Sequence, residues 1–336
     1  MDDALIVLRA LHFAATLSAA GVAAFRIFVA EPAFRATAGG GAEVETARML
    51  RSWFALIAWT SLGMAFVTSF AWLAVQTARM NDVSLDALSG DQTWTVLSQT
   101  DFGAVWLARL LIMALFAAAL LRDTPPFAVS PRRGVSSVVL AAALSGSLAF
   151  AGHAAAGEGA VGSVHLASDV LHLLGAAAWL GALIPLALLL SATLHEGEPA
   201  LAIAQTATRR FSTLGVVSVG SLVLTGIINS WVLVGSISAL IDTDYGRLLV
   251  LKIALFLVML SVAAINRTRL TPRLIHARDI SAARGAMRQL RINCMIETAL
   301  GVIILVIVGA LGTLPPGTHE DNANATIATL MASLQH

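Results

Sequence analysis

The sequence has few charged residues, and this scarcity indicates the class of protein. Only 12% of the 336 residues are Asp, Glu, Lys or Arg, whereas 57% are hydrophobic. A soluble globular domain carries about 25% charged residues, so this composition excludes one. The formal net charge of +1 favours no particular partner. The composition indicates a membrane protein that crosses the bilayer several times.

The sequence also lacks the motifs of several common chemistries. A single cysteine, Cys294, excludes an intramolecular disulfide, a CxxC metal motif and a c-type haem attachment site. The glycine run Gly39-Gly40-Gly41 is not followed by Lys-Ser/Thr, so it is not a phosphate-binding loop. We therefore do not expect the protein to use ATP hydrolysis directly. Met1-Asp2-Asp3 is acidic where a cleavable signal peptide is basic, so we expect none.

Long apolar stretches are what the sequence does have. Each is close to the roughly 20 residues that a helix needs to cross a bilayer. They predict eight transmembrane helices, at Leu5 to Ala30, Ser52 to Val75, Gly103 to Leu121, Gly134 to Gly152, His165 to Leu190, Ser212 to Gly235, Arg247 to Ile265 and Ile292 to Thr313.

Arginine is unevenly distributed between the connections and predicts their sides. Every second connection is rich in Arg, and the last of these runs from Arg267 to Arg291. The alternate connections carry Asp or Glu instead, for example Asp86 and Glu158. By the positive-inside rule, both termini are predicted to be periplasmic. The arginine-rich segment has no interleaved aromatics, so we expect it to contact anionic lipid rather than nucleic acid.

Matched motifs in corresponding stretches predict an internal repeat. Leu11-His12 is followed by Gly21 in the first stretch, and Leu171-His172 by Gly181 in the fifth, with nine residues from His to Gly in both. A second pair stands at the third and seventh stretches: Thr100-Asp101-Phe102-Gly103 six residues before Arg109, and Thr243-Asp244-Tyr245-Gly246 six residues before Lys252.

These matches predict an all-α protein built from two four-helix repeats. Four spans return the chain to its starting side, so the repeats are parallel. The first repeat comprises residues 1–160 and the second residues 161–313, with a short external tail at 314–336.

Three side chains that can bind metal begin the fifth stretch. On a helix, Asp169 lies about 40° from His165, and His172 about 20° from it on the other side, so all three share one face. Imidazole and carboxylate together suit a transition metal such as copper or zinc. The alternative is that His165 is a solvated helix start and Asp169 a favourable charge at a helix N-terminus.

Polar residues from five stretches are predicted at a common depth, roughly 10 Å into the bilayer. They are His12, Arg109, His172, Asn229 and Lys252. Charged side chains at that depth normally face a bundle interior or a wet cavity. Arg109 and Lys252 are either counter-ions, of Asp169 or of lipid phosphate, or functional groups. In the second case they bind an anion, or their positive charge promotes the release of a cation.

Two further residues complete the candidate site. His153 lies at the predicted external mouth, after the fourth stretch. Glu297 lies in the last stretch, five residues from its start, where it is either part of an exit path or proton relay, or a buried acid paired with a Ser, Thr or Arg.

The ordered set of motifs resembles the CopD family of bacterial copper-resistance proteins of the inner membrane. The resemblance covers nearly the whole chain and is carried by Arg9-Ala10-Leu11-His12, Phe102-Gly103, Trp106-Leu107-Ala108-Arg109, Gly152-His153-Ala154, Asp169-Val170-Leu171-His172, Trp179-Leu180-Gly181, Arg210-Phe211-Ser212, Tyr245-Gly246-Arg247 with Lys252, Asn266-Arg267, Glu297 and Leu314-Pro315-Pro316. It implies copper as the ion and a periplasmic copper carrier of the CopC type as the partner.

The sequence thus predicts a plasma-membrane protein, not an enzyme, that moves copper from the periplasm toward the cytoplasm. His153, His165 and Asp169 would receive the ion, and His12 and His172 would form a deeper site between the repeats. The main alternative is a b-type cytochrome, an electron-transfer protein or oxidase, whose haem iron is held by His12 and His172. A third is an assembly or sensing partner without transport of its own.

Overall fold

The computed structural model describes residues 2–36, 41–123, 131–152, 159–194, 198–277 and 280–316. Within these ranges the chain is helical and contains no strand. Eight helical segments are long and apolar enough to cross a membrane, as the sequence predicts. The elements are α1 (Asp2–Phe25), η1 (Arg26–Ala30), α2 (Glu31–Ala36), α3 (Gly41–Met80), η2 (Leu85–Ala87), α4 (Gly90–Gln99), α5 (Asp101–Arg122), α6 (Pro131–Gly146), η3 (Ser147–Ala151), α7 (Gly159–Thr193), α8 (Glu198–Val234), α9 (Ile237–Asp242), α10 (Asp244–Ile265), η5 (Asn266–Leu270), α11 (Thr271–Ile275) and α12 (Ile280–Leu311).

Several helices extend beyond their apolar stretches at one end of the bundle. α3 begins at Gly41 rather than Ser52, and α12 at Ile280 rather than Ile292. The length of an apolar run reflects the thickness of the bilayer. Backbone hydrogen bonds do not depend on side-chain polarity, so a helix can continue into polar sequence. The predicted starts of these two helices were therefore wrong by about three turns each, and much of the arginine-rich sequence is helical.

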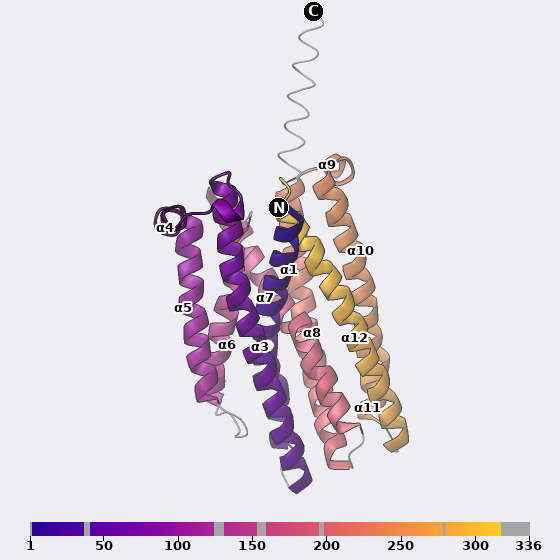
Figure 1. Ribbon diagram of the computed structural model, residues 1–336. Coiled ribbons are helices and arrows are strands. Elements are labelled where there is room, and N and C mark those ends of the chain that lie inside the picture. Colours follow the sequence, from indigo (N-terminus) through magenta and orange to yellow (C-terminus); the bar gives the residue numbers. More distant parts are fainter. Residues whose placement is uncertain are drawn as a thin grey trace, which may run out of the picture.

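The two ends of the bundle differ in what they carry. The start of α1, the end of α12 and the short helices α4 and α9 lie at one end, called here the N-terminal end (Figure 1). The extended parts of α3, α8 and α12 lie at the other, called the arginine-rich end. Both described ends of the chain lie at the same end, as an even number of spans requires.

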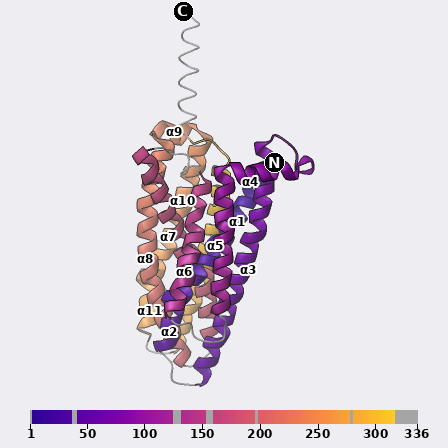
Figure 2. The ribbon, with the colours of Figure 1, turned by 90° about the vertical axis from the view of Figure 1, so that its left-hand side faces the viewer.

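Helices α1 and α7 form the centre of the bundle. α3 and α4 lie on one flank and α8, α9 and α10 on the other (Figures 1 and 2). In the most apolar part of each span, 78% of α1 and 61% of α7 are buried, against 11% of α10. The two central helices meet at Gly21 and Gly181, where a Cβ on either residue would overlap the other helix's backbone. These are the two glycines matched in the sequence.

The second pair of matched motifs also adopts one local structure twice. Thr100 caps α5 by accepting a hydrogen bond from the Gly103 amide, and Thr243 caps α10 in the same way from Gly246. A Cβ on either glycine would overlap the last turn of the preceding short helix. The two matched motifs therefore have the same local structure, while the two repeats and their boundaries stay a prediction.

Candidate functional site

His12 is held in one tautomer by the neighbouring helix. Its Nδ1 lies 2.8 Å from Thr68 Oγ1 on α3. The Thr68 hydroxyl donates its own proton to the Met64 carbonyl at 2.7 Å, so its oxygen accepts from the imidazole. The proton is thereby assigned to Nδ1, and the lone pair to Nε2.

Arg109 occupies the other nitrogen of this ring. Its Nη2 lies 2.6 Å from His12 Nε2, and its Nη1 donates to Ser147 Oγ at 2.6 Å and more weakly to the Leu144 carbonyl at 3.3 Å. Both His12 and Arg109 are buried. In this arrangement, the nitrogen of His12 that would bind a metal accepts a hydrogen bond from a guanidinium.

A second buried cation, Arg9, lies between His12 and the N-terminal end of the first four-helix half. Arg9 lies one turn before His12 on α1, and its guanidinium carbon is 5.1 Å from the centre of the Trp72 ring. The same indole meets His12 edge to face, with ring centres 5.4 Å apart. Trp72 therefore separates one buried cation from the imidazole that Arg109 holds.

A threonine on the neighbouring helix fixes the tautomer of His172, as it does for His12, but the position of Arg109 is held by a lysine. Its Nδ1 lies 2.9 Å from Thr225 Oγ1 on α8, and this hydroxyl donates to the Ser221 carbonyl at 2.6 Å. Again the proton is assigned to Nδ1 and the lone pair to Nε2. The residue that corresponds to Arg109 is Lys252, which interacts electrostatically with both His172 and Asp169.

Asp169 is the centre of the polar group in the second half. Asn229 donates from Nδ2 to Asp169 Oδ1 at 3.3 Å. The other amide atom, Asn229 Oδ1, is buried without a hydrogen-bond partner among the described residues. His165, which is 3% exposed, and Tyr245 both lie within reach of the Asp169 charge. A carboxylate, an unpartnered amide oxygen and the imidazole of His165 thus occur together here.

The two halves carry opposite charges at matching positions. Arg9 and Asp169 each precede the histidine of their helix by three residues. Trp72 and Asn229 each follow the histidine's threonine partner by four. The sequence therefore contains the whole correspondence, but only the His–Thr contacts show which residues to align.

The described contacts among the residues of the predicted polar layer fall into two sets. Arg109 contacts His12, whereas Asn229 and Lys252 accompany Asp169 and His172. Among the described residues, no three His, Cys, Asp or Glu side chains lie close enough together to hold a metal ion by themselves. His153 and Glu158 lie outside the described residues, so their place relative to His165 stays a prediction.

Glu297 lies in a separate buried network. It is 1% exposed and accepts a hydrogen bond from Asn266 Nδ2 at 2.7 Å and one from the Trp179 side chain. Asn293 donates to Asn266 at 2.6 Å, and Gln289 to Asn293 at 2.9 Å. The partners of Glu297 are therefore one amide and one indole rather than the Ser, Thr or Arg considered from the sequence.

The sequence contained a signal for this network. Gln289, Asn293 and Glu297 recur every four residues on α12, which places them on one helix face. Asn266 begins the π-helical segment η5, and such segments often accompany functional sites. Since α12 begins at Ile280, Glu297 lies deep within its helix and not near the end.

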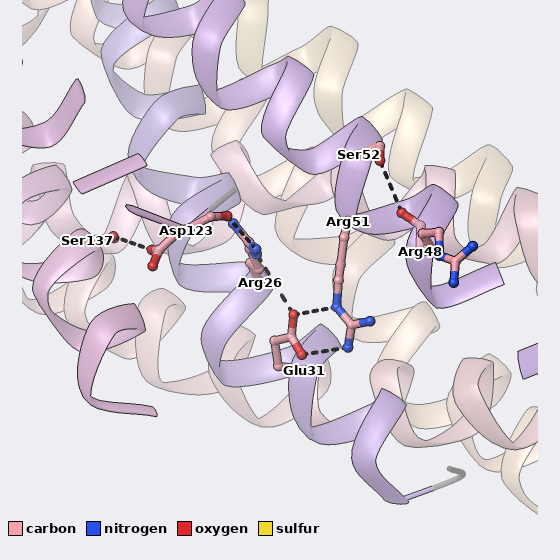
Figure 3. Close-up of polar contacts among 7 residues, drawn as sticks. All are labelled: Arg26, Glu31, Arg48, Arg51, Ser52, Asp123 and Ser137. Carbon is pink, nitrogen blue, oxygen red and sulfur yellow. Dashed lines mark hydrogen bonds and ion pairs between the residues drawn. The ribbon is translucent and has the colours of Figure 1, made fainter. Parts of the chain in front are cut away.

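A buried ion-pair cluster links helices of the first half at the arginine-rich end (Figure 3). Arg51 binds Glu31 through two hydrogen bonds of 2.9 Å, and Arg26 lies 3.9 Å from the same carboxylate. Arg26 also donates to the Asp123 carbonyl at 3.1 Å, while Asp123 accepts from Ser137 at 2.6 Å. Arg51 belongs to one of the arginine-rich connections that served only as a topology signal in the sequence, but here it is a structural partner of Glu31.

Comparisons with known proteins agree along most of the chain. The family described as copper resistance protein D-like, N-terminal domain, matches residues 1–163, and the family described as copper resistance protein D matches residues 205–311. A protein of Pseudomonas syringae pv. tomato named copper resistance protein D is 31% identical over 243 residues, which cover 68% of this chain and 76% of that protein.

Two further relatives are similarly distant. The inner membrane protein YebZ of Escherichia coli (strain K12) is 28% identical over 318 residues, 93% of this chain and 98% of that protein. The copper transport protein CutJ of Bacillus subtilis (strain 168) is 28% identical over 227 residues, 65% of this chain, which span only 38% of its own length. No solved structure matches the chain.

Proposed function

Because the chain belongs to the copper resistance protein D family, we propose that this copper-related membrane protein takes a copper ion at the N-terminal end of the bundle and passes it toward the arginine-rich end. The family match and the copper names of two relatives support the ion. The eight candidate spans and the name of a relative that aligns over 98% of its length support a multi-pass protein of the inner membrane.

The polar group of the second half is the proposed copper site. His172 offers the Nε2 lone pair, Asp169 a negative carboxylate, and Asn229 an amide oxygen that is buried without a partner. An unpartnered buried acceptor is costly unless something binds it. This orphaned oxygen beside a carboxylate is the observation that carries the proposal. His165, one turn away, and His153 are the proposed entry ligands.

The donor set favours the cupric ion. Nitrogen and oxygen ligands suit Cu(II), whereas Cu(I) prefers the sulfur of Cys or Met. The site has few protein ligands, so coordination positions remain for the ligands of a donor or acceptor. A transfer site needs binding that is strong enough to accept the ion and weak enough to release it. The proposed donor is a periplasmic copper carrier of the CopC type.

The path onward follows α7. Trp179 lies two turns beyond His172 on the same helix face, about 10 Å along the axis, and its side chain contacts Glu297. Glu297 is the next carboxylate toward the arginine-rich end, so we place it on the exit route. His12 has no place in this route, because its Nε2 accepts from Arg109.

The haem alternative has no support from the relatives, whose names refer to copper or to the inner membrane. The contact between Arg109 and His12 Nε2 also leaves that nitrogen unable to bind iron in this arrangement. An absorption spectrum of the purified protein tests this directly, and we expect no Soret band.

Electron paramagnetic resonance of Cu(II) added to the purified protein tests the copper site. The wild type should bind one Cu(II) with nitrogen hyperfine coupling. His172→Ala should lose that coupling, and His12→Ala should keep it. Loss of the signal in His12→Ala with retention in His172→Ala would contradict the assignment to the second half.

A further inference from the structure

A pocket opens at the N-terminal end of the first half. Its volume is about 440 Å³, within the range of small-molecule sites. Its wall comes from α1, α3, α5, the end of η3 with the residue after it, and the residues that follow α12. The residues that give it chemical character are Arg9, Trp72, Gln76, Arg79 and Phe102.

Arg9 lies at the inner side of this pocket. Its residue is 9% exposed, and its Nε is buried without a hydrogen-bond partner among the described residues. Gly312 leaves room for the guanidinium, because a Cβ there would overlap it. A buried guanidinium is costly unless its donors are used. Arg9 therefore lines the cavity with a guanidinium whose Nε has no hydrogen-bond partner among the described residues.

The pocket is unsuited to a copper ion. Arg9 and Arg79 are close enough for their charges to repel each other, and a metal cation entering between them would be repelled by both. In the second half, the position of Arg9 is held by Asp169, and that of Trp72 by Asn229. The two halves thus present related sites of opposite charge.

We propose that the pocket of the first half binds a small organic carboxylate. Guanidinium groups bind carboxylates through paired, charge-assisted hydrogen bonds, and the two arginines with Gln76 supply donors. The indole of Trp72 and the ring of Phe102 supply an apolar wall for a carbon skeleton. This wall favours an organic anion over inorganic phosphate. The site is separate from the proposed copper site and needs no copper.

Equilibrium dialysis of radiolabelled succinate against the purified full-length protein tests the proposal, at constant ionic strength and without copper. The wild type should bind one succinate saturably, and phosphate in tenfold excess should not displace it. Arg79 is exposed, so Arg79→Gln should fold normally and weaken binding at least tenfold. Arg9→Gln should weaken it further. Arg48→Gln, at the other end of the molecule, is the matched control and should bind like the wild type.

Absence of saturable succinate binding by the wild type would overturn the proposal, as would unchanged affinity in Arg79→Gln. Displacement by a tenfold excess of phosphate, or by vesicles of anionic lipid, would overturn the assignment to an organic carboxylate. These outcomes leave the copper proposal untouched, because Cu(II) binding is measured separately and is expected to be normal in Arg79→Gln.

Discussion

At the scale of single residues, the threonine partners of the two histidines are the least expected feature. The sequence indicated His12 and His172 as a matched pair, because each precedes a glycine by nine residues. It did not indicate Thr68 or Thr225, since a threonine in an apolar helix has no distinguishing pattern. The opposite surroundings of the imidazoles were also missed, because Arg9 and Asp169 align only once those contacts are known.

Removing the threonine partners should affect the halves differently. Thr225→Val removes the acceptor that fixes the tautomer of His172, and loss of such outer partners typically weakens metal binding about 10- to 100-fold. Thr68→Val makes the same change beside His12 and is the matched control, with Cu(II) affinity unchanged. Isothermal titration of both variants measures this. Equal losses would indicate a shared site, as the sequence alone predicted.

The Asp169 carboxylate gives a second prediction at this scale. Asp169→Asn keeps the size of the side chain but removes its negative charge, so copper uptake at limiting copper should fall about tenfold, or about 1.4 kcal/mol. Uptake at saturating copper should be largely restored. The helix-dipole role considered from the sequence is wrong, because α7 begins at Gly159 and Asp169 lies ten residues further on, beyond the first turn. The remaining alternative is that Asp169 only holds Asn229 in place. Uptake at limiting copper would then equal that of the wild type.

At the scale of helices, the number of spans was predictable and their ends were not. The apolar runs alone gave eight spans. The extensions of α3 and α12 escaped prediction because polar sequence continues a helix without an apolar signal. The π-helical segments η1 and η5 also have no recognisable pattern, although Asn266 in η5 organises the Glu297 network.

The crossing of the two central helices supplies the prediction at this scale. A Cβ at Gly181 would overlap the backbone of Leu17, so Gly181→Val should force α1 and α7 apart. Overpacking of this kind typically costs about 1–3 kcal/mol or more, which should lower the melting temperature in detergent. Gly63 on α3 has nothing within 4 Å of a Cβ, and Gly63→Val is the control. Similar melting temperatures for both variants would contradict the close crossing.

At the scale of the whole molecule, the sequence predicted an all-helical protein with both ends on one side, and the described ends do lie together (Figure 1). Which side they face stays a prediction from the arginine distribution. Reporter fusions after Pro316 and near Asp86 should be periplasmic, and fusions between α11 and α12 cytoplasmic. A cytoplasmic reporter after Pro316 would reverse the proposed direction of entry.

The surroundings of the matched histidines also differ between the two halves of the molecule, which was not predicted from the sequence. Two equivalent histidines suggested one site between the repeats. The described surroundings of the two histidines differ, because a guanidinium contacts His12, whereas Asp169 with its partner Asn229 precedes His172 by one turn. In our proposals, the charge at this matching position, rather than the histidine itself, distinguishes the cation site of the second half from the anion pocket of the first.

Uptake of radioactive copper into proteoliposomes at matched protein amounts tests the central claim most directly. The wild type should carry copper inward, His12→Ala should keep most of that uptake, and His172→Ala should lose it even at saturating copper. Equal uptake by the wild type and His172→Ala would contradict the account.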